Sequence, residues 1–186
     1  VTGFTGAGVA LTGSAGATTA VVTGSGTTYN VVVSGMTDSG TVIATIPAGN
    51  AQDPAGNGNA ASTSTDNNVA YDADVPTVTI NQTAAQADPT NASPITFDVV
   101  FSKAVTGFTN ADVLLSGSAG ASTAAVSGSG TTYTVTVSGM SSDGTVIASI
   151  PAGGAVDSVG NTNAASTSTD NTVTYDITGP TVTINQ

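Results

Sequence analysis

The feature that most constrains the fold of this chain is an internal repeat with a period of 104 residues. Residues 1–82 align with residues 105–186 without a gap, and 59 of these 82 aligned pairs are identical. A period of about 100 residues is too long for one unit of a solenoid and matches a complete small domain. We therefore expect tandem domains that share one fold.

The copies of the repeat meet at two proline junctions, residues 71–76 and 175–180, and the sequence Pro-Thr-Val-Thr-Ile-Asn-Gln begins at each proline. Cutting there gives three expected parts: a first repeat over 1–75, a complete repeat over 76–179, and the first strand of a following repeat over 180–186. The first repeat has no counterpart of residues 76–104, so we expect it to lack its first two strands. We expect the sequence to be a window from a longer array.

Alternating apolar residues predict an all-β fold. In the segment 94–101, Ile95, Phe97, Val99 and Phe101 share one face of a strand, because side chains along a strand alternate with a period of two. The glycines of 127–130 predict a tight hairpin turn, and 151–170 is expected to be a loop with at most a short extra strand. The expected strands of the complete repeat are 77–81, 95–101, 112–116, 122–128, 131–138, 144–150 and 171–176. Seven short strands separated by turns favour tandem immunoglobulin-like β-sandwich domains.

Composition excludes several classes of function. The net charge is −11, from twelve acidic residues, all of them Asp, and a single Lys. One cation cannot neutralise many phosphates, so nucleic acid is not an expected partner, and no apolar run is long enough for a membrane-spanning helix. The chain has no His, Cys or Glu, which removes histidine-based triads, thiol nucleophiles and zinc sites. We expect a protein that is not an enzyme. An acidic, cysteine-free chain rich in Thr, Ser and Gly indicates an exported bacterial surface protein.

Several motifs resemble a known group of proteins. The Thr-Val-Thr-Ile opening, Phe-Ser-Lys-Ala-Val-Thr-Gly-Phe at 101–108, Ile-Pro-Ala-Gly at 150–153 and the Asp-x-x-Gly-Asn segments at 53–57 and 157–161 are similar to the bacterial Ig-like repeats of large surface adhesins and biofilm-associated proteins. The resemblance implies β-sandwich domains strung into an extracellular stalk, often with calcium at the domain junctions. Lys103 departs from the pattern, because such repeats commonly carry an acidic residue there.

The aspartates are the candidate functional residues. If the strands alternate in direction, the first junction collects acidic and amide side chains from the end of one domain and the upper loops of the next: Asp38, Asp72, Asp74, Asn110, Asp112, Asp157 and Asn161. Two carboxylates about 4 Å apart repel by about 4 kcal/mol at an effective dielectric constant near 20, so such a cluster must spread out, take up protons or bind a cation. An all-oxygen ligand set predicts Ca²⁺ as a structural cofactor.

The second junction is poorer in acidic residues, since Thr178 and Gly179 replace Asp74 and Val75. A calcium site there would depend on Asp176, Asp88 and Asp143, and we expect weaker affinity. For Asp66 and Asp170 we favour a turn-forming role, in which the carboxylate accepts hydrogen bonds from nearby backbone amides. For Asp53 and Asp157 both roles remain open.

These observations favour a structural stalk repeat of an extracellular adhesin at the cell surface, whose partners are neighbouring Ig-like repeats. The alternative is a subunit of a self-assembling extracellular filament, in which residues 180–186 of one chain add to the open sheet of another. That tail would replace only one of the two missing strands. A carbohydrate-binding module is less favoured, because Phe97, Phe101 and Tyr133 fall on expected core faces. For Lys103 we favour a solvated turn residue over an isopeptide bond.

Overall fold

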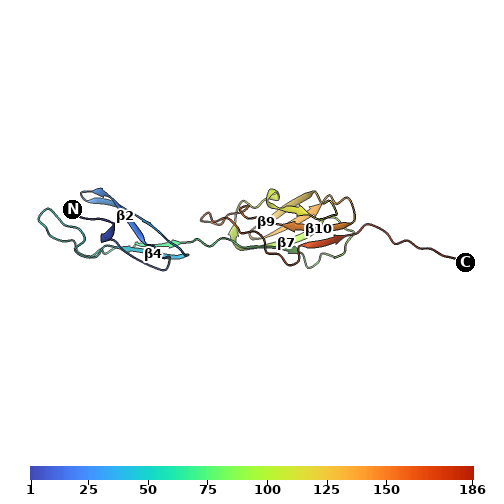
Figure 1. Cartoon of the computed structure of the whole chain (residues 1–186), viewed down its shortest axis with the longest axis horizontal. Helices are drawn as coiled ribbons and strands as arrows, with labels where there is room; N and C mark the ends of the chain where they lie inside the picture. The colour runs from blue at the N-terminus through green and yellow to red at the C-terminus, as the bar shows by residue number, and fades with distance from the viewer. The chain divides into compact units, whose positions relative to one another are not determined.

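The computed structural model describes all residues, 1–186, which form two compact units, Val1–Asp74 (unit 1) and Val75–Gln186 (unit 2). Both units are all-β (Figure 1). The only helical elements are two three-residue 3-10 turns, η1 (Gly6–Gly8) and η2 (Asn110–Asp112). No helix is long and apolar enough to cross a membrane. The predicted fold class is confirmed.

Unit 2 is built from two antiparallel sheets of three strands each. One sheet has the order β6 (Val78–Gln82), β7 (Ile95–Val105) and β9 (Thr123–Ser138). The other has the order β11 (Thr172–Tyr175), β10 (Gly144–Ser149) and β8 (Leu114–Ser116). The register of β6 on β7 places Val78 opposite Phe101 and Gln82 opposite Phe97.

The core of unit 2 lies between the two sheets. Along β7, the alternating residues Ile95, Phe97 and Val99 are all 0 % exposed, as the two-residue period predicts. The phenyl ring of Phe101 meets the rings of Phe108 and Tyr133 edge to face, with centroids 5.4 Å and 5.8 Å apart. Offset and edge-to-face geometries are favoured by the aromatic quadrupole. Phe97, Phe101 and Tyr133 are buried as predicted, and Phe108 joins them.

Strand β6 is held on both sides. Besides β7, it contacts the segment 164–170, which runs beside it as an irregular strand. The amides of Ala164 and Thr167 donate to the carbonyls of Pro76 (2.9 Å) and Val78 (3.1 Å), and the amide of Gln82 donates to the carbonyl of Asp170 (2.7 Å). The flanking contacts leave Val78 2 % and Ile80 0 % exposed.

Unit 1 repeats this plan without the two strands that correspond to β6 and β7. Its strands β1 (Ala10–Thr12), β4 (Gly40–Thr45) and β5 (Asn68–Tyr71) form one sheet. Strands β2 (Thr19–Ser25) and β3 (Thr28–Ser34) form a two-stranded second sheet. Its buried hydrophobic residues are only Ala15, Val42 and Ala51. Unit 1 is therefore a sandwich with most of its interior uncovered.

The predicted hairpin is present in both units. In unit 1, β2 and β3 pair from Thr19–Ser34 to Ser25–Thr28 around a turn that contains Gly26. In unit 2, β9 includes both arms, since the amide of Ser122 donates to the carbonyl of Ser138. Gly128 has a φ of 113° and lies so close to the Thr132 carbonyl that a Cβ would clash, so the turn requires glycine there.

One detail of the predicted strands is wrong. The strand expected over 112–116 begins only at Leu114, because η2 occupies Asn110–Asp112 and is closed by a capping box between Thr109 and Asp112. The segment 151–170 is a loop without a named strand, which agrees with the expectation; Val156 forms one isolated bridge with Thr106 and another with Thr162. The second bridge closes a turn in which backbone amides bond to Asp157 rather than to a neighbouring strand.

Candidate functional site

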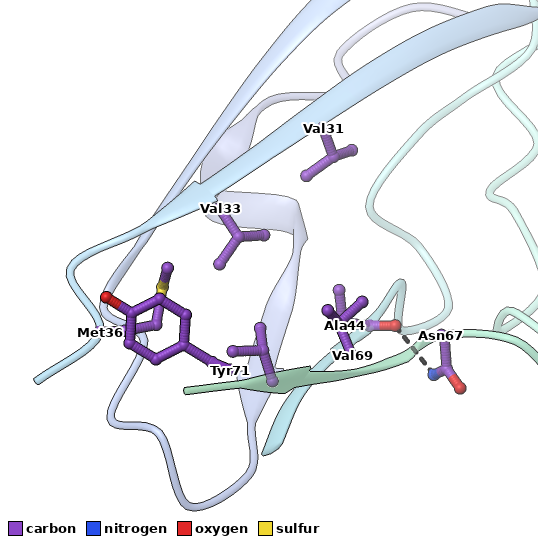
Figure 2. A pocket seen from close by; sticks show the side chains of 8 residues that line it. Val31, Val33, Met36, Ala44, Asn67, Val69 and Tyr71 are labelled. Carbon is purple, nitrogen blue, oxygen red and sulfur yellow. Dashed lines mark hydrogen bonds between the residues drawn. The ribbon is translucent and has the colours of Figure 1, made fainter. Parts of the chain in front are cut away.

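An open apolar groove crosses unit 1 between its two sheets (Figure 2). It encloses about 350 Å³ and is lined by Val31, Val33, Met36, Val42, Ala44, Asn67, Val69 and Tyr71. Figure 2 shows Val31 and Val33 reaching from β3 toward the side of the groove formed by Val69 and Tyr71 on β5. The side-chain amide of Asn67 donates to the carbonyl of Ala44 at 2.9 Å and so ties β5 to β4. This bond strengthens the β4–β5 side of the groove.

Each of the eight lining residues has an identical counterpart 104 residues later. In unit 2 those counterparts form the core: Val135, Val137, Val146, Ala148 and Val173 are all 0 % exposed. The side chains of β6 and β7 complete that core, including Ile80, Phe97 and Val99. Val69 is 65 % exposed and its counterpart Val173 is 0 % exposed. The groove therefore has the lining of a completed core and lacks the two strands that cover it.

Three predicted calcium ligands lie in unit 1. Asp72 accepts a hydrogen bond from the backbone amide of Asp74 (3.0 Å) and one from the hydroxyl of Ser39 (3.4 Å). Asp38, next to Ser39 in the chain, accepts a bond from the hydroxyl of Thr37 (2.7 Å). The loop before β4 and the segment after β5 are thus joined, which brings the parts of the chain that carry Asp38 and Asp72 together.

Asp157 forms the most elaborate of the acidic turns. One carboxylate oxygen accepts the amides of Val159 (3.0 Å) and Asn161 (2.9 Å), and the other accepts the side-chain amide of Asn161 (3.0 Å). Burial opposes ionisation, but these hydrogen bonds and the charge of Lys103 outweigh it and lower the pKa of Asp157 to about 2. The turn-forming role, one of the two left open for Asp157, is present in the structure.

The expectation for Lys103 was wrong. Lys103 lies within β7 rather than in a turn, and its ammonium nitrogen is 3.5 Å from the Asp157 carboxylate. The side chain of Lys103 is 28 % exposed and that of Asp157 is 3 % exposed. The β7 strand continues past Phe101 to Val105, beyond its predicted end, which carries Lys103 to the loop that contains Asp157.

Asp112 acts as a cap. Its carboxylate accepts bonds from the backbone amide (2.7 Å) and hydroxyl (2.8 Å) of Thr109 and so closes η2. Asn110 in the same turn accepts the amide of Val126 at 2.7 Å. The loops that carry Asp112 and Asp157 lie at one end of unit 2, since the backbone of Thr106 pairs with Val156. Their joint role as calcium ligands stays a prediction.

The three aspartates expected at the second junction surround the exit of β11. Asp88 accepts the amide of Thr174 (2.9 Å), Asp143 accepts the amide of Ile177 (2.7 Å) and the hydroxyl of Thr178, and Asp176 accepts the amide of Thr178 (3.0 Å). The hydroxyl of Thr178, followed by the Ile177 amide, lowers the pKa of Asp143. These bonds fix the chain as it leaves unit 2.

Two further aspartates, Asp170 and Asp53, also accept hydrogen bonds from nearby amides. Asp170 accepts the side-chain amide of Gln82 (3.1 Å), so it contacts β6 in addition to its place in a turn. Asp53 repeats the Asp157 turn, with bonds from Asn57 and Ala55, and the Asn57 side chain is the main cause of its lowered pKa. No three of the acidic side chains form a metal-binding group within either unit.

Sequence reasoning did not identify the lining of the groove. It predicted an open sheet in unit 1, because unit 1 has no counterpart of residues 76–104. The eight residues that line the groove can be identified only once the burial of their counterparts in unit 2 is known. Asn163 was also missed. It is 2 % exposed, accepts the amide of Ala155 (2.8 Å), and donates to the carbonyls of Pro151 and Ala164. Its identity with Asn59 in the aligned repeat was the available signal.

The comparisons with known proteins identify a family. Comparison with curated proteins found no match, and comparison with solved structures found none. The family model for the bacterial Ig-like domain matches residues 72–177, which contain all the strands of unit 2. The chain therefore belongs to the bacterial Ig-like domain family.

Proposed function

We propose that the chain is a repeat segment of an extracellular bacterial surface protein, in which Ig-like units are linked head to tail into a stalk that carries an adhesive region away from the cell. The observation that carries this proposal is the 104-residue repeat of a bacterial Ig-like sequence, with the same proline junction at each boundary. A stalk needs domains that fold alike and are joined by short linkers. Its role is mechanical rather than catalytic.

Calcium is the proposed stiffening element at the first junction. Asp38, Asp72 and Asp74 supply oxygen ligands from unit 1, and Asp112 and Asp157 are the proposed contribution of unit 2. Hydrogen bonds already bring the segments of Asp38 and Asp72 together, and neighbouring carboxylates of one charge favour a hard divalent cation that reduces their repulsion. At the second junction the set of ligands is smaller, Asp88, Asp143 and Asp176, and it is proposed to bind calcium more weakly than the first junction does.

Small-angle scattering in calcium and in chelator tests the stiffening. We expect the distribution of the maximum dimension of the chain to be narrower with calcium. Chelation should broaden this distribution again. The paired variant Asp72→Asn/Asp74→Asn should behave like chelated protein, because it removes two of the proposed carboxylate ligands. Asp66→Asn is the matched control, since Asp66 is in the favoured turn-forming class. Identical scattering with and without calcium would contradict the metal part of the proposal.

A second candidate is supported by the open groove. The uncovered face of unit 1 and the strand-like sequence of residues 180–186 would fit a filament joined by strand complementation between subunits. The mass of the native protein separates the two candidates. A mature mass near 17.7 kDa favours the filament, and a mass many times larger favours the stalk of a giant surface protein.

A further inference from the structure

We propose that Asn57 is a site of spontaneous deamidation, at which the backbone nitrogen of Gly58 displaces the side-chain amide and residue 57 becomes aspartate or isoaspartate. The inference goes beyond the proposed function and does not depend on it. Three observations support it: the Asn-Gly sequence at 57–58, the outward-facing amide of Gly58 in the folded unit, and the surface turn that holds Asn57. The aligned turn of unit 2 has Asn161 followed by Thr162 and provides a comparison within the same chain.

The reaction needs no reagent other than water, and asparagine is among the chemically labile residues. The backbone nitrogen of Gly58 gives up its proton to solvent and forms a bond to Cγ of Asn57. The bond from Cγ to the side-chain nitrogen breaks, and that nitrogen takes up a proton and leaves as ammonia. The product is a five-membered succinimide ring. Water then adds a hydroxyl group to one ring carbonyl and returns a proton to the ring nitrogen, which gives aspartate or isoaspartate and one new negative charge.

The fold leaves the attacking nitrogen open. Gly58 forms an isolated antiparallel bridge whose hydrogen bonds are made by the residues on either side of it. The amide of Asn59 donates to the carbonyl of Ala51 (2.9 Å), and the amide of Asp53 donates to the carbonyl of Asn57 (3.0 Å). At such a position the central N–H points away from the paired segment. Because Gly58 is also exposed, its nitrogen faces solvent.

The residue after the asparagine separates the two turns. Gly58 has no Cβ beside its nitrogen, whereas Thr162 has a β-branched side chain there. The turns are otherwise alike, since Asp53 accepts the amides of residues 55 and 57 and Asp157 accepts those of residues 159 and 161. We therefore expect the turn of unit 1 to react and the turn of unit 2 to stay intact.

Asp53 is a positioning residue that slows the reaction. Its carboxylate accepts the side-chain amide of Asn57 at 2.9 Å and the backbone amide of Asn57 at 2.8 Å. Ring closure requires the Asn57 side chain to rotate until Cγ meets the nitrogen of the next residue, so the side-chain bond must break first. Asn57 is exposed, and water competes for that bond. The rate of deamidation therefore depends on how often the turn opens.

Conversion changes the electrostatics of the turn. The amide that donates to Asp53 is replaced by a carboxylate oxygen, so an attraction becomes a repulsion between like charges. The same amide is the main cause of the lowered pKa of Asp53, so this pKa should rise after conversion. Isoaspartate also lengthens the main chain by one carbon and moves the carbonyl that accepts the Asp53 amide. The modified turn should open.

Peptide mass spectrometry of the folded 186-residue chain, kept at mildly alkaline pH, tests the inference. Cleavage before aspartate gives the peptides 53–65 and 157–169, one for each turn. We expect the modification to accumulate at Asn57 in the first peptide and to be absent from the second. The rate should rise with pH, because the attacking nitrogen must lose its proton. A protease that cleaves before aspartate and not before isoaspartate separates the two products.

Three variants sharpen the comparison. Gly58→Thr should abolish detectable conversion of Asn57 over the same period, and threonine fits there because unit 2 carries it in the same turn. Thr162→Gly is the reciprocal change and should make Asn161 reactive. Asp53→Ala should speed the conversion of Asn57, since it removes both bonds that hold that residue.

The inference is overturned by any of three results: an intact Asn57 in the folded chain under conditions that convert it in denaturant, equal conversion in the two peptides, or conversion of Asn57 that survives Gly58→Thr. A rate that Asp53→Ala leaves unchanged would reject the positioning role of Asp53. None of these results bears on the proposed stalk, because neither calcium nor the proline junctions enter the measurement.

Discussion

Units 1 and 2 place the same residues in opposite environments. Val69 and Val173 occupy aligned positions and have the same cross-strand partner, since Val69 pairs with Val42 and Val173 with Val146. Yet Val69 is 65 % exposed and Val173 is 0 % exposed. The difference comes from β6 and β7, which cover one unit and are missing from the other. Burial is therefore decided by what a residue packs against, even when the residue itself and its cross-strand partner are unchanged.

Hydrogen bonds of short range are unaffected by the missing strands. Asn59 accepts the amide of Ala51 (2.8 Å) and donates to the carbonyls of Pro47 (3.0 Å) and Ala60 (2.7 Å). Asn163 makes the same three bonds in unit 2. Loops of unit 1 thus keep their local structure although the core is open. The comparison of the two units therefore separates the loop structure, which local hydrogen bonds determine, from the burial of the core, which contacts between distant segments determine.

The largest expected effect comes from a charge on the shared valine. Val173→Asp buries an unpaired carboxylate in a filled core, so we expect unit 2 to lose on the order of 4 kcal/mol of unfolding free energy. Val69→Asp puts the same charge at an exposed position and should cost unit 1 less than about 1 kcal/mol. Hydrogen exchange read by mass spectrometry, with peptides assigned to each unit, measures both. Equal losses would mean that the groove of unit 1 is already covered.

The asparagine pair gives a smaller and more specific difference. Asn163→Ala leaves the buried amide of Ala155 and the part-buried carbonyls of Pro151 and Ala164 without these partners, so we expect a loss of roughly 2–3 kcal/mol in unit 2. Asn59→Ala removes the same bonds where water can replace them, and should cost about 1 kcal/mol in unit 1. Denaturant unfolding of the two variants gives the comparison. A larger loss for Asn59→Ala would contradict the assignment of Asn163 to a water-excluded site.

The smallest expected effect is a dependence on pH. The pKa of Asp157 is about 2 in the folded protein and ordinarily 3.8, so the unfolded chain binds the proton more tightly. The stabilisation is complete above the ordinary value and is lost as pH falls through about 2. We expect unit 2 to lose stability between pH 4 and pH 2, approximately the window set by these two values, and Asp157→Asn to reduce that loss.

A matched control for the pH effect is Asp98→Asn. Asp98 lies on the exposed face of β7, so its substitution changes the net charge equally without touching the turn. Unfolding followed by circular dichroism at several pH values measures all three proteins. An acid-induced loss that is the same in Asp157→Asn and the parent chain would show that the Asp157 turn does not contribute to it.

Much of the fold was predictable from the sequence because its signals are local. The two-residue alternation in 94–101 gave the buried face of β7, and the glycines of 127–130 gave the hairpin. Prediction failed where a side chain competes for the backbone. Asp112 caps η2 and delays the start of β8, which was expected to begin at residue 112. Lys103 was misplaced because β7 extends four residues past its predicted end at Phe101.

The sequence by itself determined the repeat, the all-β class, the acidic composition without His or Cys, and the copy of residues 76–82 at 180–186, since each of these depends on residue type and spacing alone. Only the tertiary structure decided which residues are covered. It showed that Val31, Val33 and Val69 line an open groove whereas their counterparts are core, and that 60–66 is an exposed copy of an edge that holds β6. The physical reason is that burial depends on contacts between segments far apart in the chain, which no local pattern encodes.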